Sequence, residues 1–76
     1  MAVRAKMTCV MNKVDAQYPD QQQVRLEAVY SNGDDANASW SKDTPSGRLE
    51  LSITNPEAFN QFVVGKTYHV DFTSAD

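Results

Sequence analysis

Four segments of the chain alternate apolar and polar side chains with a period of two, and this alternation is the strongest constraint on its fold. Successive side chains of a β-strand point to opposite faces of the sheet, so each segment predicts a half-buried strand. The segments are residues 1–11, 24–31, 48–54 and 66–72. Their expected inward side chains are Val3, Ala5, Met7, Cys9 and Met11, then Val24, Leu26, Ala28 and Tyr30, then Leu49, Leu51 and Ile53, and finally Tyr68, Val70 and Phe72.

The segment between the last two alternating runs has the features of a short helix near residues 55–63. Asn55 is a good N-cap, and Pro56 suits the first helical position because no N–H is needed there. Gly65 is able to end the helix in a left-handed conformation. Phe59 and Phe62 lie three residues apart, so we expect them to share a face and to close one end of a curled sheet.

The remaining residues are mostly polar loops, with one further short strand expected around Trp40 in residues 39–42. The predicted fold is therefore mainly β (α+β): a small five-stranded antiparallel sheet or an OB-like barrel with one short helix. A simple sheet with the helix on one face is the alternative. The 76 residues make a single domain, 1–76, with a small core. A protein partner or a homo-oligomer would add stability.

Composition excludes several classes of protein. A net charge of −3 disfavours a general nucleic-acid binder, which needs a basic face. No apolar run approaches the ~20 residues of a transmembrane helix, and the basic N-terminus lacks the apolar core of a signal peptide. We therefore expect a protein without membrane contact. One cysteine and one histidine provide neither an intramolecular disulfide nor a structural zinc site, and no cofactor is expected.

Candidate chemistry in the chain is sparse, and in each case a structural role is favoured. His69 and Asp71 share the outward face of the last strand, where they could exchange a proton, but a solvated strand face explains them better. Cys9 lies on an apolar face, which favours an inert buried thiol over a nucleophile. A weak calcium loop would use oxygens of Asn32, Asp34, Asp35 and Asn37, but their spacing does not match an EF-hand. We expect no catalytic and no metal-binding residues.

The residues chosen for a partner-binding surface are Trp40, Arg25 and Arg48. Trp40 is the only tryptophan, and it would either fill the core, which is favoured, or anchor a partner. Arg25 and Arg48 belong to a possible basic stripe on the outward faces of the strands, together with Arg4 and Lys6. Cross-strand pairing with Glu27 and Glu50 is the favoured explanation for these cations.

Several short motifs resemble those of a group of short proteins encoded by tailed bacteriophages. They are the turn at residues 44–47 (TPSG), the strand carrying Leu49, Leu51 and Ile53, the helix start at residues 55–58 (NPEA), and Gly65-Lys66 leading into Tyr68-x-Val70-Asp71-Phe72. The resemblance lies mainly over residues 40–76, and the opening VRAKMTCV is similar too. It implies a viral origin and a location in the bacterial host cytoplasm or the virion, but no activity.

Three functions are compatible with these observations. The first is a non-enzymatic protein that binds a host factor or a host-defence complex. The second is a virion component, such as a capsid decoration or a connector accessory. The third is an OB-like binder of single-stranded nucleic acid or a nucleotide, which would use the basic stripe. An enzyme is disfavoured because no proton-transfer and nucleophilic groups converge.

Overall fold

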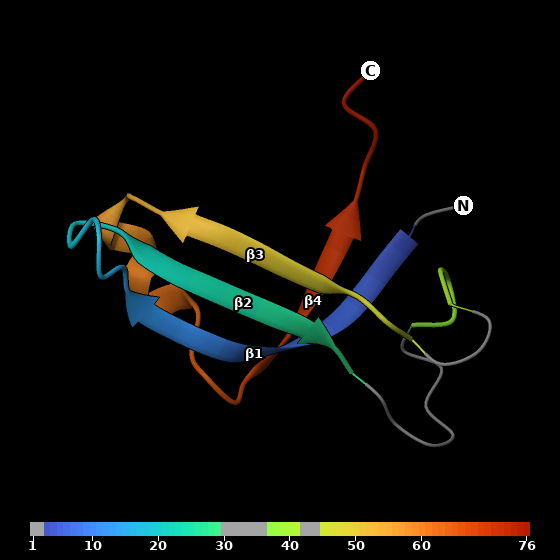
Figure 1. Ribbon diagram of the computed structural model, residues 1–76. Coiled ribbons are helices and arrows are strands. Elements are labelled where there is room, and N and C mark those ends of the chain that lie inside the picture. Colours follow the sequence, from blue (N-terminus) through green and yellow to red (C-terminus); the bar gives the residue numbers. More distant parts are fainter. Residues whose placement is uncertain (1–2, 30–36, 42–44) are drawn as a thin grey trace.

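The computed structural model describes residues 3–29, 37–41 and 45–76, which form one antiparallel sheet of four strands and one short helix (Figure 1). The elements are β1 (Val3–Val14), β2 (Gln22–Ala28), β3 (Arg48–Ile53), the 3₁₀ helix η1 (Pro56–Gln61) and β4 (Thr67–Phe72). The strand order is β3-β2-β1-β4. The mainly β prediction is confirmed.

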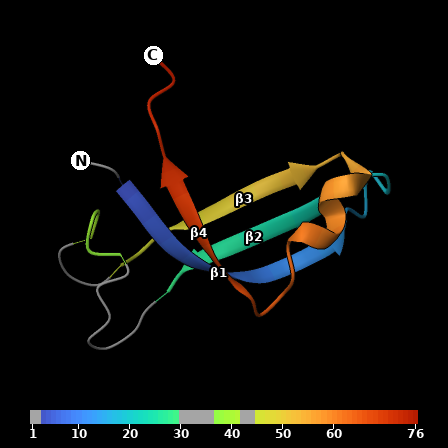
Figure 2. The ribbon, with the colours of Figure 1, turned by 180° about the vertical axis from the view of Figure 1, so that it is seen from behind.

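The sheet is open, because β3 and β4 occupy its two edges and do not pair with each other. The long strand β1 joins two parts: its first half pairs with β4, and its second half pairs with β2. Figures 1 and 2 show β4 and the first half of β1 running steeply across the direction of β2 and β3, so that the sheet is strongly curled.

The expected fifth strand around Trp40 is not formed. Residues 37–40 make a turn instead, in which the Asn37 carbonyl accepts hydrogen bonds from the Trp40 and Ser41 N–H groups. Two serines and an asparagine in this segment favour such local hydrogen bonding over a ladder. Without this strand, the described part of the chain gives a curled open sheet.

A β-bulge changes the inward pattern of β1. The pairing register with β2 shifts between Cys9 and Met11, which leaves Val10 as the extra residue. After the bulge Asn12 pairs with Val24, and Met11 pairs with Arg25. Directly paired residues share a face, so Asn12 points inward and Met11 outward. The expected inward position of Met11 is therefore wrong, since simple alternation does not anticipate the bulge.

The core lies on the concave face of the curled sheet. Its buried apolar side chains are Ala5, Met7, Cys9, Val24 and Leu26. Partly buried side chains pack around them, namely Trp40, Leu49, Ile53, Phe62, Tyr68 and Val70. The buried Cys9 thiol agrees with its predicted structural role. The alternation thus identified the core-facing residues of β2, β3 and β4, and of β1 as far as Cys9, while Tyr30 lies outside the described residues.

The helix begins as predicted but is tighter and shorter. The Asn55 side chain accepts a hydrogen bond from the Glu57 N–H, and Pro56 is the first helical residue. The helix is 3₁₀, however, and ends at Gln61. Gly65 does have a positive φ of 94°, but in the turn that leads to β4 rather than at the helix end. Both phenylalanines are half-buried, and Phe62 packs on the core and against Tyr68.

Within the described ranges, no helix has both the length and the apolar character required to cross a bilayer.

Candidate functional site

A buried asparagine fixes the turn that carries Trp40. Asn37 is 4% exposed, and its amide group makes four hydrogen bonds. Its Oδ1 accepts from the Lys6 N–H at 2.7 Å and from the Trp40 Nε1–H at 3.0 Å. Its Nδ2 donates to the Lys6 and Val29 carbonyls at 3.3 and 3.1 Å. Asn37 therefore joins β1, the end of β2 and the indole ring.

The same turn covers the part of the β1 edge that β2 does not reach. β2 ends at Ala28, and the backbone groups of Arg4 and Lys6 lie past that end on the same edge of β1. The Ser39 hydroxyl accepts from the Arg4 N–H at 3.1 Å and donates to the Arg4 carbonyl at 3.0 Å, while Asn37 bonds Lys6 in the same manner. The side chains of Asn37 and Ser39 thus make the hydrogen bonds that a neighbouring strand would make, and they prevent another strand from pairing with this edge.

Trp40 lies half-buried between the core and an apolar pocket of about 270 Å³. The pocket is at the open end of the curled sheet, between the beginning of β3 and the end of β4. It is lined by Ala5, Met7, Trp40, Gly47, Arg48 and Phe72. Phe72 is 58% exposed, although it shares the inward face of β4 with Tyr68 and Val70. The pocket has almost no polar surface.

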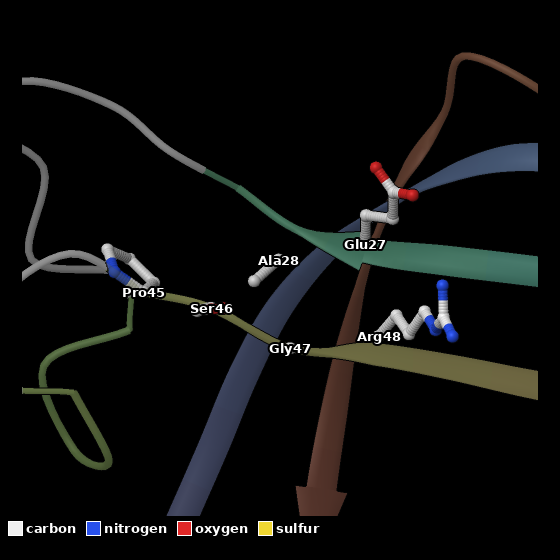
Figure 3. Close-up of a pocket in the computed structure, with 6 residues that line it drawn as sticks. All are labelled: Glu27, Ala28, Pro45, Ser46, Gly47 and Arg48. Carbon is white, nitrogen blue, oxygen red and sulfur yellow. The ribbon is translucent and has the colours of Figure 1, made fainter.

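A second, polar hollow of about 450 Å³ lies beside the first (Figure 3). It forms where β2 ends and the segment before β3 begins, and its lining residues are Glu27, Ala28, Pro45, Ser46, Gly47 and Arg48. Glu27 and Arg48 are direct cross-strand partners. Gly47 and Arg48 contribute to both hollows, so this short segment separates the apolar pocket from the polar one.

The three residues predicted for a partner surface do not form one cluster. Arg25 and Arg48 lie on the outer face, where both guanidinium groups contact Glu50 at 3.5 and 3.3 Å. Trp40 packs on the opposite, inner face. Arg48 is the link, because it also lines the pocket beside Trp40. The core interpretation of Trp40 applies in part, since its ring packs on the core, and the ring also forms a pocket wall.

The outer-face cations are arranged for cross-strand pairing. Arg25 is opposite Glu50, and Arg48 is opposite Glu27. Arg4 is opposite Asp71 and holds its carboxylate with two bonds of 2.6 and 3.2 Å. Each of these three arginines is thus beside a carboxylate, as the favoured interpretation predicted, whereas Lys6 is opposite His69. The Arg25 Nε is buried without a hydrogen-bond partner, which marks this pairing as imperfect.

The Arg4 pair makes folding sensitive to acid. The hydrogen bond from the Arg4 guanidinium holds the pKa of Asp71 below its ordinary value of 3.8. A lowered pKa in the folded state stabilises the protein above the ordinary value, and this stabilisation disappears as the pH falls through the lowered value. Both side chains are largely exposed, so we expect a small effect.

We therefore expect Asp71→Asn to lower the urea midpoint slightly at about pH 7 and to have no effect at about pH 2. Equilibrium urea unfolding at both pH values tests this. The wild-type protein keeps a second source of acid sensitivity, because two backbone N–H groups lower the pKa of Asp15 in the β1–β2 turn. An equal difference between the two proteins at both pH values would contradict the expected role of the pair.

Other sequence-based candidates do not converge into a reactive site. His69 is exposed and opposite Lys6, while its neighbour Asp71 is bound to Arg4. For the calcium alternative, both Oδ1 and Nδ2 of Asn37 are occupied by protein hydrogen bonds, and Asn32, Asp34 and Asp35 lie outside the described residues. Residues 3–29, 37–41 and 45–76 contain no group of three or more His, Cys, Asp or Glu side chains placed to hold a metal ion.

Sequence reasoning missed two residues of this site, Asn37 and Phe72. Phe72 was expected to be an inward core residue, and only its position at the end of an edge strand indicated that it would be exposed. Asn37 was considered as a calcium ligand. The sequence feature that indicates its structural role is its position three residues before Trp40. A side chain at this spacing is able to hydrogen-bond to groups of the same turn.

Comparison with known proteins identifies no relative: no family model matches the sequence, and neither a curated protein nor a solved structure matches it.

Proposed function

We propose that this chain is a small non-enzymatic protein of phage type that binds another protein in the bacterial host through the pocket beside Trp40. The pocket would receive one apolar side chain of the partner. The observation that supports this proposal is the apolar pocket between Trp40 and the exposed Phe72 at the open end of the sheet. Aromatic side chains are enriched among the residues that dominate binding energy in protein interfaces.

The size and lining of the pocket favour a side chain over a small-molecule ligand. Its volume of about 270 Å³ is just below the ~300–1,000 Å³ typical of small-molecule sites. Such sites also need a few polar groups to orient the ligand, and this lining offers almost none. A nucleotide, with its phosphates and base edges, is therefore a poor occupant.

The nucleic-acid alternative has less support than protein binding. A phosphate-tracking face requires cations available to displace counterions. Here Arg4 is held by Asp71, and Arg25 and Arg48 share Glu50. The absence of binding to a labelled single-stranded oligonucleotide at low salt would remove this alternative.

Filling the pocket provides a direct test. Gly47 has no positive φ, and a Cβ atom placed there would meet only the Trp40 ring, at 3.6 Å from Cη2, which is an ordinary contact. Gly47→Leu should therefore occupy the pocket without backbone strain. We expect it to weaken binding of the partner at least about tenfold, because the anchor side chain is excluded. Affinity capture from host lysate, followed by calorimetry with the purified partner, measures the change.

Tyr18→Ala is the matched control, since Tyr18 is an exposed aromatic residue in the β1–β2 turn, away from the pocket lining. It should leave affinity unchanged. If the Gly47→Leu variant is folded and binds the partner as tightly as the wild type, the pocket is not the binding site. If the wild-type protein retains no protein from the lysate, the proposed function is wrong.

A further inference from the structure

The edges of the sheet differ in how they are protected. The uncovered part of β1 is closed by Asn37 and Ser39, as described above. β3 carries two charged side chains, Arg48 and Glu50, and η1 contacts it. Charges of this kind oppose pairing with another strand. β4 contains neither proline nor a bulge, and its Asp71 is paired with Arg4, as Glu50 of β3 is paired with Arg25 and Arg48. Because η1 contacts β3, the edge of β4 is the less covered of the two.

The hydrogen bonds around Cys9 show which backbone groups of β4 face the free edge. The Cys9 N–H donates to the Lys66 carbonyl at 2.9 Å, so the Lys66 carbonyl points toward β1. Successive residues in a strand point their backbone groups to alternate edges. The N–H and C=O groups of Thr67, His69 and Asp71 therefore point away from β1. Within the described ranges, no strand pairs with them.

Exposed apolar side chains lie at both ends of this edge. Val63 and Val64, just before β4, are 44% and 56% exposed, and Phe72 at its end is 58% exposed. The Tyr68 hydroxyl accepts from the Val63 N–H and donates to the Gln61 carbonyl. Tyr68 and Phe72 share the inward face of β4, so these bonds hold the backbone of the segment before β4 beside that face.

We propose that two copies of this chain associate by antiparallel pairing of β4 with β4 about a two-fold axis at His69. In this register His69 pairs with its counterpart and Thr67 pairs with Asp71 of the other copy, so that all outward-facing backbone groups of β4 are bonded. This gives about six intermolecular hydrogen bonds. Antiparallel pairing is what a two-fold axis produces, and the same edge serves both copies.

This register also brings the exposed apolar ends together. Phe72 of one copy lies opposite Lys66 of the other. Lys66 is the last residue of a turn that its N–H closes by a bond to the Val63 carbonyl, so the Val63–Val64 segment lies at the same end of the strand as Phe72 of the other copy. Each interface therefore brings Phe72 and the Val63–Val64 segment together twice. A two-fold pairing uses the apolar groups at both ends of the strand, because each end of one copy meets the opposite end of the other.

Charge substitution tests the register, with the mass of the full chain measured by sedimentation or by light scattering after gel filtration. Val64→Lys and Phe72→Glu, made separately, should each raise the dissociation constant of the dimer about 100-fold, because a charge then faces an apolar group at both contacts. In the V64K/F72E double variant, each contact becomes a pair of opposite charges, and we expect the dimer to return. If both single variants are monomeric and the double variant remains monomeric, the proposed register is wrong.

A proline substitution tests the backbone contribution separately. The N–H of His69 faces the free edge, so His69→Pro removes an intermolecular donor while the bonds to β1 remain, and proline is tolerated at such edge positions. We expect a folded monomer by circular dichroism, whereas His69→Ala should stay dimeric. A wild-type protein that is monomeric at about 1 mM, or a folded dimeric His69→Pro variant, would overturn the proposal. The Gly47→Leu variant should remain dimeric, which separates this proposal from pocket binding.

Discussion

Replacing Asn37 with alanine is expected to lower the free energy of unfolding by about 3 kcal/mol, the largest effect of any alanine substitution considered for this chain. The amide group makes four hydrogen bonds in a site where the residue is 4% exposed. Buried polar groups that lose a partner cost about 1–3 kcal/mol each. The Lys6 carbonyl keeps its bond from the Val29 N–H, so the cost falls on the Lys6 N–H, the Val29 carbonyl and the indole N–H. A 76-residue domain has only about 4–11 kcal/mol of total stability.

Urea unfolding monitored by far-ultraviolet circular dichroism measures the effect. Ser39→Ala is the matched control, because Ser39 makes the same type of edge contact with Arg4 in a more exposed position. We expect it to cost about 0.5–1 kcal/mol. Asn37→Asp keeps both accepted bonds but places a carboxylate oxygen against the Lys6 and Val29 carbonyls, so it should cost at least as much as Asn37→Ala at about pH 7. Equal destabilisation by the alanine variants of Asn37 and Ser39 would show that burial of the amide does not matter.

The strands were predictable because each has a solvated face and a buried face. In β3, for example, Leu49, Leu51 and Ile53 all lie toward the core, as the alternation indicates. The alternation pattern gave a wrong prediction around Trp40, where side-chain hydrogen bonds replace the pairing of backbone groups between strands. The segment around Trp40 has the composition of a short strand, but Asn37 and Ser39 bond the edge of β1 with their side chains, and the backbone turns away. This exchange depends on tertiary contacts with Arg4 and Lys6, which are more than thirty residues away in sequence.

The candidate site was predictable only in part, for a geometric reason. Trp40, Arg25 and Arg48 were chosen by residue type, but the sheet places Arg25 and Trp40 on opposite faces. Only Arg48 lies at a strand start that borders both faces. The pocket lies where β3 and β4 remain unpaired. An unpaired sheet edge produces no recognisable side-chain pattern in the sequence, so the pocket was not predictable.

The bulge in β1 is the second feature that alternation does not reveal, and it has a structural consequence. By inserting Val10, it brings Asn12 onto the inward face at the end of the sheet near η1. There the Asn12 Nδ2 donates to the Phe59 and Phe62 carbonyls at 3.0 and 2.6 Å, and its Oδ1 accepts from the Gln22 Nε2 at 2.6 Å. A 3₁₀ helix of six residues is not stable alone. Asn12 thus attaches the helix to the sheet.

We expect Asn12→Ala to lower the free energy of unfolding by about 2 kcal/mol, because two carbonyls at the helix end and one side-chain donor lose their partner. The loss should be concentrated near the helix. Hydrogen exchange of the Val63 N–H, which donates to the Tyr68 hydroxyl, reports on this end of the sheet and should accelerate more than exchange in β1 and β4. Asn55→Ala removes only the N-cap bond to the Glu57 N–H and should cost about 1 kcal/mol. If Asn12→Ala costs no more than Asn55→Ala and leaves Val63 exchange unchanged, then the helix is held by Phe62 packing alone, and the inward asparagine that the bulge creates does not hold the helix.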